Sequence, residues 1–280
     1  MGEAFPIALC DSRHGPLLVP ADDAVIGRAI ALYGQFAEAV PRLLCSALAP
    51  GDTAVDVGAN IGTVALPLAR AVGPSGRVYA FEPQRRAHAL LGVNAALNGL
   101  SQLVPIRAGL AAAAGMMVVP SADAPDGGNQ GAVALAAEGP GDPVPVIPLD
   151  ALDLPACALI KIDVEGMEAA VLAGAAGTIA RHRPILYAEA HPGPGTMACL
   201  SWLAAAGYRC HWHISPFWDA DNIAGARSNV FGDRGDVNVL ALPAEAGLSI
   251  DLPPVSGADA DWRADIERWA AARQAPSPGR

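Results

Sequence analysis

The strongest constraint on the fold is an alternation of short apolar strands with helix-length segments, separated by glycine-rich turns. In the first part of this pattern, strands and helices are predicted in alternation at 53–57, 61–72, 77–81, 85–97 and 104–108. A strand, a helix and a second strand in succession form a right-handed crossover unit, and repeated units build a parallel sheet. The sequence therefore predicts an α/β fold, with a mostly parallel sheet and helices on both faces.

The alternation resumes after a segment with a weaker pattern. Residues 109–146 are dominated by Ala, Gly, Pro and Asp, and we expect a loop or a pair of short strands over the sheet edge. Beyond this segment, strands are predicted at 158–164, 184–190, 208–214 and 236–242, and helices at 167–181 and 195–206. The predicted sheet thus combines strands that are far apart in the sequence.

Helices are also expected toward the two ends of the chain. Residues 22–48 have apolar side chains at helical spacing, and Pro41 is expected to divide this segment into two helices. The tail at 259–273 is predicted to be a short amphipathic helix with Trp262 and Trp269 on one face. That face is expected to pack on the core or on a second copy of the chain.

The composition argues against several classes of protein. The chain has 280 residues, with 28 acidic and 18 basic side chains and a formal net charge of −10. Such a surface repels phosphate backbones, so general nucleic-acid binding is not expected.

Mean hydropathy is +0.31, but no apolar run approaches the roughly 18 residues of a membrane span. No signal peptide is recognised, and five cysteines without a CxxC pair favour the reducing cytoplasm over a disulfide framework or zinc site.

The first motif that indicates chemistry is VDVGANIG at 55–62. The strand delivers Asp56, and Gly58 and Gly62 allow the backbone of the following turn to approach a ligand. The next helix N-terminus offers N–H groups to an anion at the carboxyl end of a parallel strand. The G-x-N-x-G spacing, with Asn60 at its centre, differs from the G-x-G-x-x-G of dinucleotide sites. It suits the carboxylate and amine of an amino acid, with Asp56 beside the amine.

The second motif is YAFEP at 79–83. Glu82 ends the second predicted strand, 20 residues beyond Gly62. A carboxylate at this place can accept two hydrogen bonds from a ribose diol, as in nucleotide-binding α/β folds. Together the two motifs predict an adenosyl ligand with an amino acid at its other end, which is S-adenosylmethionine.

The third motif is LIKIDVEGMEAAVLAGA at 159–175. Lys161, Asp163 and Glu165 alternate along an apolar strand and its exit. Buried charges are costly unless they pair or have a function. Lys161 is expected to form a structural ion pair with Asp163 or Glu165. For the two acids, which lie beside the predicted cofactor cleft, a functional role is expected.

In order and spacing, VDVGANIG, AFEP, KIDVEGMEAAVLAGA and RPILYAEAH resemble the FkbM family of S-adenosylmethionine-dependent methyltransferases over 52–190. The lead-in at 22–38 is similar as well. HWHISPFWDADNIAG at 211–225 and NVFGDRGDVNVLALP at 229–243 resemble a C-terminal segment of a bacterial subset of the family. The resemblance covers most of the chain, up to about residue 247.

The resemblance implies a class I methyltransferase fold, usually a seven-stranded sheet whose last strand is antiparallel. It also implies methyl transfer, commonly to a hydroxyl oxygen of a sugar or secondary metabolite. For adenine, residues 108–111 offer only backbone and apolar contacts, where many such enzymes place a polar residue. The residues implied to bind the cofactor are Asp56, Gly58, Asn60 and Gly62 at the methionine end and Glu82 at the ribose.

Three units are expected along the chain: a helical lead-in (1–51), a methyltransferase domain (52–247) and a tail with a short amphipathic helix (248–280). The expected partner is a small-molecule or glycosidic acceptor. The expected setting is the cytoplasm of a bacterium, and the tail leaves room for a homo-oligomer.

Methyl transfer to oxygen is an in-line displacement in which a base removes the hydroxyl proton. The principal candidates for catalysis follow predicted strands, and they are Asp163, Glu165, His191 and His211, with Glu189 and His213 beside them. Aromatic side chains expected to line the acceptor pocket are Trp212, Phe217 and Trp218. A divalent ion held by Asp163, Glu189, His191 and His211 is a lesser alternative, since these residues are far apart in sequence and form no HxxxH-type pair. No metal ligand is therefore expected.

Two functions of other classes stay open beside O-methyl transfer. One is an NAD-type oxidoreductase on a similar sheet, against which the G-x-N-x-G spacing counts. The other is a non-catalytic binding domain that retains the fold, against which the intact cofactor motifs count. An N-methyltransferase is less expected, because the chain has no Asn/Asp-Pro-Pro-Tyr tetrapeptide.

Overall fold

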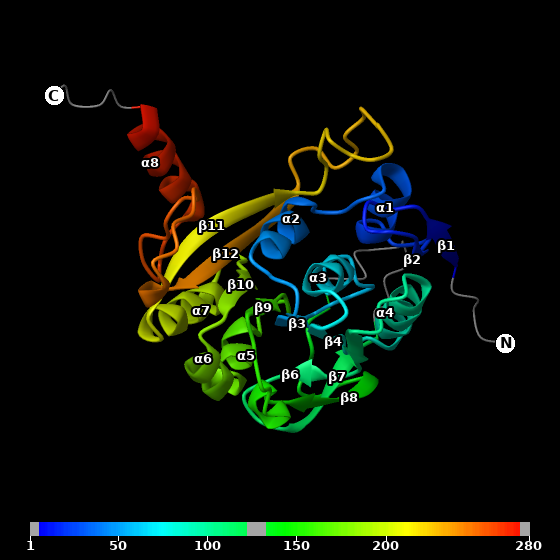
Figure 1. Ribbon diagram of the computed structural model, residues 1–280, viewed down its shortest axis with the longest axis horizontal. Helices are drawn as coiled ribbons and strands as arrows, with labels where there is room; N and C mark the ends of the chain where they lie inside the picture. Colours follow the sequence, from blue (N-terminus) through cyan, green and yellow to red (C-terminus); the bar gives the residue numbers. More distant parts are fainter. Residues whose placement is uncertain (1–5, 122–132, 275–280) are drawn as a thin grey trace.

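The computed structural model describes residues 6–121 and 133–274, and a seven-stranded sheet forms its centre (Figure 1). The strands lie in the order β11–β12–β10–β9–β3–β4–β5. Their bounds are β3 Thr53–Val57, β4 Arg77–Phe81, β5 Leu103–Ile106, β9 Leu159–Ile162, β10 Ile185–Glu189, β11 Tyr208–Pro216 and β12 Gly235–Pro243. β12 runs antiparallel to both of its neighbours, and the other adjacent pairs are parallel. The expected mostly parallel sheet with one antiparallel strand is confirmed.

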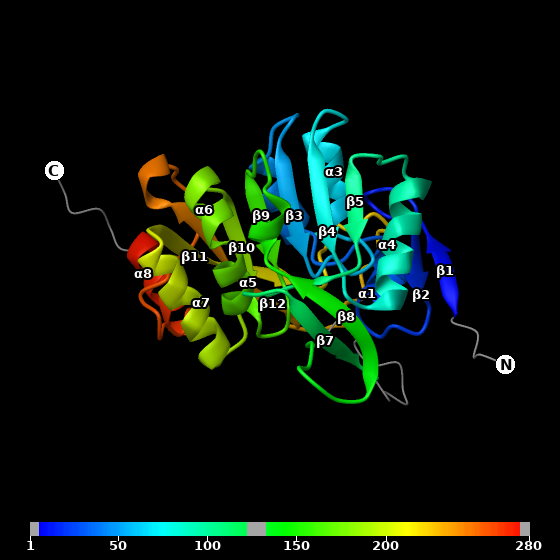
Figure 2. The same ribbon diagram turned by 90° about the horizontal axis from the view of Figure 1, so that it is seen from below.

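Helices cover both faces of the sheet, as Figures 1 and 2 show. One face packs against α2 (Ala39–Ser46), α3 (Ala65–Val72) and α4 (Arg85–Leu97), and the other against α5 (Glu168–Gly174), α6 (Ala176–His182) and α7 (Pro194–Ala205). Side chains alternate between the two cores because successive residues of a strand point to opposite faces. In β3, Ala54 enters the first core, and Val55 and Val57 enter the second.

Several predicted elements match the structure to the residue. These are the strands at 53–57 and 77–81 and the helix at 85–97. Each has a strong local pattern between turn residues, so local propensity and tertiary packing favour the same boundaries.

Three predicted helical segments differ from the structure, and one of them, predicted at 61–72, begins only at Ala65 as α3. The N-terminal helical segment breaks at Gly34, where α1 (Ile26–Tyr33) ends in a left-handed conformation, and not at Pro41. Pro41 lies in the first turn of α2, where its missing N–H has no helical partner to lose. The helix predicted at 167–181 is two helices, α5 and α6, which meet at Ala175.

Additional strands flank the central sheet. The segment at 109–146 contributes β6 (Gly109–Leu110), β7 (Gly115–Pro120) and β8 (Gly141–Ile147), which form a separate three-stranded sheet. Residues 122–132 of this segment lie outside the described residues. An N-terminal hairpin of β1 (Ile7–Cys10) and β2 (Leu17–Pro20) was not predicted.

The tail forms α8 (Trp262–Gln274), in agreement with the predicted helix, and residues 275–280 lie outside the described part. Trp262 packs against the second core, but the most buried side chain of the helix is Asp265. Short 3₁₀ turns occur at Leu149–Leu152 and Ala244–Ala246. Among the described residues, no helix has both the length and the apolar character needed to cross a bilayer.

Candidate functional site

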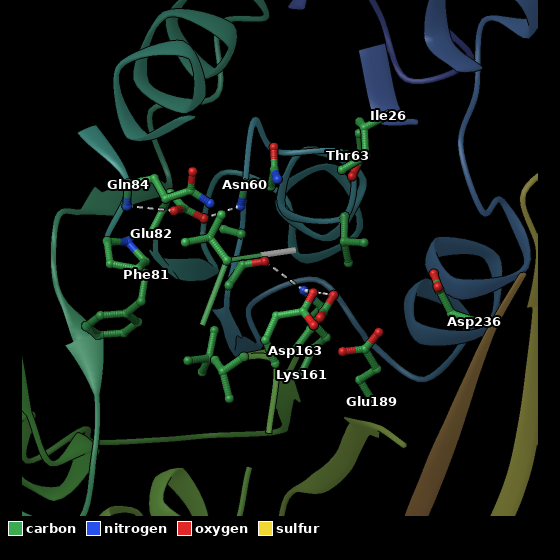
Figure 3. Close-up of a pocket in the computed structure, with 18 of the residues that line it drawn as sticks. Ile26, Asn60, Thr63, Phe81, Glu82, Gln84, Lys161, Asp163, Glu189 and Asp236 are labelled. Atoms are coloured by element: carbon green, nitrogen blue, oxygen red, sulfur yellow. Dashed lines mark hydrogen bonds and ion pairs between the residues drawn. The ribbon is translucent and has the colours of Figure 1, made fainter. Parts of the chain in front are cut away.

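A large pocket opens at the carboxyl ends of β3, β4, β9 and β10, where open α/β sheets bind ligands (Figure 3). Its empty volume is about 1180 Å³, with the open solvent at its mouth included. Figure 3 shows Glu82, Asn60 and Gln84 at one end, and Lys161, Asp163 and Glu189 at the other. The three sequence motifs therefore meet at one cavity.

At the first end of the pocket, two backbone hydrogen bonds position the side chain of Glu82. Its two carboxylate oxygens accept separate hydrogen bonds from the backbone N–H groups of Asn60 and Gln84, both at 2.8 Å. Burial raises the pKa of Glu82 to about 7, although these two hydrogen bonds favour the ionised form. Each carboxylate oxygen can accept more than one hydrogen bond. The side chain is thus fixed in place and can still accept bonds from a ligand.

Gly58 and Asn60 form the turn between β3 and the segment before α3, and both line the pocket. Gly58 has a φ of +77°, and a Cβ atom there would lie 1.8 Å from the carbonyl oxygen of Asp163. Only glycine fits this close crossing of the two strand ends. Asn60 also has a positive φ, of 48°, a conformation that Asn tolerates better than most residues.

Gly62 does not line this pocket. It also has a positive φ, of +99°, and a Cβ atom there would lie 2.3 Å from a side-chain carbon of Leu66. Its amide donates to the carbonyl of Ala59 at 2.9 Å. The structure therefore accounts for this glycine by turn geometry and packing, and not by the predicted cofactor contact.

Asp56 is fully buried and does not line the pocket. Its Oδ1 lies 3.1 Å from Nζ of Lys161, which also lies 3.3 Å from Asp163 and donates to the carbonyl of Gly58 at 2.9 Å. Burial alone would lower the pKa of Lys161, but the Asp56 and Asp163 carboxylates raise it above its usual value. Asp56, predicted to lie beside a ligand amine, here pairs with Lys161 within the sheet. The expected structural ion pair of Lys161 is confirmed, with Asp56 as an additional partner.

Acidic side chains dominate the second end of the pocket. Asp163, Glu165 and Glu189 line it, and burial raises the pKa of Glu189 to about 8. His191 lies at the edge of this cluster with its side chain 58% exposed; its Nε2 is 3.0 Å from Glu189 and 3.5 Å from Glu165. The neighbouring Glu189 carboxylate raises the pKa of His191 to about 9. His191 therefore lies against two carboxylates at the edge of the acidic cluster.

The sequence analysis did not identify two polar residues of β12 that line the same end. Asp236 faces the pocket (Figure 3), and burial raises its pKa to about 7. Asn238 is buried and is the register partner of Glu189 on the adjacent strand β10, and none of the described residues accepts a hydrogen bond from its side-chain nitrogen. The one available signal was a pair of polar residues at the start of an otherwise apolar strand. That signal is weak without knowledge of the antiparallel register.

The two histidines of β11 have different surroundings from those predicted. His211 does not line the pocket; its Nδ1 lies 3.3 Å from the carbonyl oxygen of Leu252. His213 is buried, and its Nδ1 lies 2.7 Å from the hydroxyl of Tyr187. Burial lowers the pKa of His213 to about 4, so it stays neutral. Because β11 is the edge strand, its histidines are separated from the end of β9 by two intervening strands.

An apolar wall faces the acidic groups. It combines Phe217 with residues of the N-terminal segment, namely Val25, Ile26, Phe36 and Val40. Trp212, which was expected here, belongs to the second core and donates through Nε1 to Asp265. At the Glu82 end, Ala108, Gly109 and Leu110 line the pocket with backbone and apolar groups.

Comparison with known proteins gives one family. The sequence profile described as "Methyltransferase FkbM domain" matches residues 56–210. No curated protein matches the chain.

Similar solved structures include methyltransferases of several kinds. Methyltransferase FkbM from Methylobacillus flagellatus KT is 18% identical, with a TM-score of 0.45, over 71% of this chain and 50% of that one. Precorrin-6y C5,15-methyltransferase from Geobacter metallireducens GS-15 is 14% identical, with a TM-score of 0.47, over 72% of this chain and 86% of that one. A SAM-dependent O-methyltransferase from Thermotoga maritima is 13% identical, with a TM-score of 0.44, over 84% and 77%.

Proposed function

The chain belongs to the FkbM family of S-adenosylmethionine-dependent methyltransferases, and from this membership we propose that it methylates a hydroxyl oxygen of a sugar or another small secondary metabolite. The observation that supports this assignment best is the shape of the pocket. One cavity joins a buried, hydrogen-bonded carboxylate, Glu82, to an acidic end at Asp163. The glycine turn at Gly58 lies between these two ends, where strands β3 and β9 approach each other.

The residues of the first end fit the bound cofactor. Glu82 accepts hydrogen bonds from the ribose hydroxyls, since its oxygens keep acceptor capacity beside the two backbone donors. The turn of Gly58 and Asn60 binds the methionine end, and residues 108–110 cover the adenine with apolar and backbone groups. Asp56 acts indirectly, by holding Lys161 against the carbonyl of Gly58. Gly62 supports the turn from outside the pocket.

S-adenosylmethionine supplies an electrophilic methyl group on a sulfonium sulfur. The acceptor oxygen must therefore lie in line with the carbon–sulfur bond, and the chain contributes mainly alignment and proton removal. We assign removal of the acceptor's hydroxyl proton to Asp163. Its carboxylate lies at the pocket end beside the Gly58 turn and is held by Lys161. Glu165 and His191 lie next to each other at the adjacent edge of the site. His211 has no part in this proposal, because it lies outside the pocket.

The test is a calorimetric titration of the purified protein with S-adenosylmethionine and, separately, with NAD. Binding of the methyl donor alone, followed by transfer of labelled methyl to hydroxyl compounds, is the expected result. Binding of NAD alone would assign the chain to the oxidoreductases. Binding of the donor with transfer only to amines would replace O-transfer by N-transfer, and binding of neither ligand would identify a non-catalytic domain that retains the fold.

The cellular setting and organisation are also proposals. A cytoplasmic setting is supported by the five cysteines, all of which are free thiols. A small-molecule acceptor is supported by the pocket with its apolar wall, and the net charge of −10 argues against nucleic acid. The division into 1–51, 52–247 and 248–280 and the oligomeric state are tested by limited proteolysis and by light scattering of the intact chain.

A further inference from the structure

Three potential metal ligands converge at the acidic end of the pocket. Oxygen atoms of Glu165 and Glu189 and a ring nitrogen of His191 all lie within 4.8 Å of one another. They come from the ends of two neighbouring parallel strands: Glu189 ends β10, His191 follows it, and Glu165 lies in the turn after β9. The strand pairing therefore brings together residues separated by more than 20 positions.

The spacing of these atoms matches a shared ion. Oxygen and imidazole ligands bind first-row divalent metals at about 2.1 Å, so neighbouring ligand atoms lie about 3.0 Å apart in octahedral and about 3.4 Å apart in tetrahedral sites. Nε2 of His191 lies 3.0 Å from Oε2 of Glu189 and 3.5 Å from Oε2 of Glu165. The first distance equals the octahedral separation, and the second lies slightly beyond the tetrahedral one, so both are close to the separations of adjacent ligands of one ion.

A second observation concerns Glu189 alone. Its side chain is only 8% exposed, yet Oε2 accepts no hydrogen bond from any described residue. His191 is close to this oxygen, but the pair does not have hydrogen-bonding geometry. A buried carboxylate oxygen without a donor is costly. Nε2 of His191 and Oε2 of Glu189 are close but are not oriented for a hydrogen bond with each other. This arrangement is expected when both atoms bind the same metal ion.

The charges around the cluster favour a cation. Asp163 and Asp236 line the same end of the pocket, and the positive charge of Lys161 is committed to Asp56 and Asp163. A set of two carboxylates and one imidazole is borderline in softness, which suits Mn²⁺, Fe²⁺ or Zn²⁺ better than Ca²⁺.

We propose that Glu165, Glu189 and His191 bind one divalent first-row metal ion at the acceptor end of the pocket. These ligands differ from the set considered in the sequence analysis, which included Asp163 and His211. In the structure Glu165 takes the place of His211, and Asp163 pairs with Lys161. Resting on the proposed function, the role of the ion is to hold the acceptor oxygen beside Asp163 and to favour its deprotonated form.

The experiment is a titration of the full-length protein with Mn²⁺, followed by electron paramagnetic resonance of the free and bound ion. We expect one saturable site per chain, and a nitrogen coupling from an imidazole in the bound spectrum. His191→Ala removes that coupling, and both His191→Ala and Glu165→Gln weaken Mn²⁺ binding at least about tenfold, since even second-shell changes cost 10- to 100-fold. His211→Ala is the matched control, and it leaves binding and coupling unchanged.

Circular dichroism and S-adenosylmethionine binding, measured on the same samples, separate this proposal from the proposed function. Donor binding without saturable Mn²⁺ binding up to about 1 mM, the weak end of protein cation sites, overturns the metal site and leaves the methyltransferase proposal standing. Mn²⁺ binding that survives His191→Ala and Glu165→Gln in folded protein also overturns it. Mn²⁺ binding that these variants remove, in a protein that binds no donor, supports the metal site and contradicts the proposed function.

Discussion

Asp56 and Lys161 are register partners on the adjacent parallel strands β3 and β9, and their side chains form a buried ion pair at 3.1 Å. The pair lies at the edge of the pocket, because Lys161 lines it and also contacts Asp163 and the carbonyl of Gly58. This ion pair at the centre of the sheet thus holds together the ends of β3 and β9, which form the floor of the site.

Removal of the lysine is expected to destabilise the fold. Lys161→Met leaves Asp56 buried without a counter-charge, and the free energy of unfolding should fall by about 3–5 kcal/mol. Denaturant unfolding followed by circular dichroism measures this change. The double variant Asp56→Leu/Lys161→Met leaves no uncompensated charge in that pair and should recover much of the loss. A single variant as stable as the parent protein would contradict the pairing.

Glu82 is expected to control donor affinity. Glu82→Ala should weaken binding of S-adenosylmethionine by about 1–3 kcal/mol, the range for hydrogen bonds to a charged group. Titration calorimetry gives the dissociation constant, and the circular dichroism spectrum controls for folding. An unchanged dissociation constant in folded protein would rule out the ribose contact.

The same carboxylate predicts a pH dependence. The pKa of Glu82 is raised to about 7 by burial, and the ribose hydroxyls bind best to the ionised form because that form accepts at both oxygens. Donor binding should therefore tighten as pH rises through 7, by up to about tenfold between pH 6 and pH 8. Binding near pH 7 should release protons, which calorimetry in buffers of different ionisation enthalpy detects. Glu82→Gln should remove both effects.

His191 is expected to affect turnover and not donor binding. His191→Ala should lower the rate of methyl transfer at least about tenfold, because its side chain contacts Glu189, and Figure 3 shows Glu189 at the opposite end of the pocket from Glu82. Its side chain is 58% exposed, so the fold should tolerate the change. The measurement is transfer of labelled methyl at saturating donor, together with the donor dissociation constant. Equal rates in the parent protein and the variant would show that His191 has no part in turnover.

Asp265 is expected to fix the C-terminal helix. It accepts hydrogen bonds from Nε1 of Trp212 at 2.8 Å and from the amide of Ser256 at 3.0 Å, and it pairs with Arg268. Asp265→Ala leaves the buried Nε1 of Trp212 and the amide of the exposed Ser256 without this acceptor, and should cost about 1–3 kcal/mol of stability. It should also expose 248–280 to limited proteolysis while donor affinity stays the same. Asp265→Asn, which keeps an acceptor oxygen, should lose less.

Elements with strong local patterns could be predicted from the sequence. The strands at 53–57 and 77–81 and the helix at 85–97 have apolar periods that turn residues delimit, so their boundaries follow from nearby residues. The pocket positions of Gly58 and Glu82 were predicted for the same reason, since each directly follows such a strand. Pro41 shows the limit of local rules, because a proline is equally compatible with a helix break and with a first helical turn.

The sequence by itself thus determined the alternating units, the parallel sheet and the end of the sheet that bears the site. Only the tertiary structure decided which polar side chains meet there. Strand register placed Asp56 opposite Lys161 and out of the pocket, joined Glu165 to His191, brought in Asp236 from β12, and left His211 at the sheet edge. The physical reason is that periodicity encodes the face to which a residue points, whereas the pairing of distant strands sets which residues become neighbours.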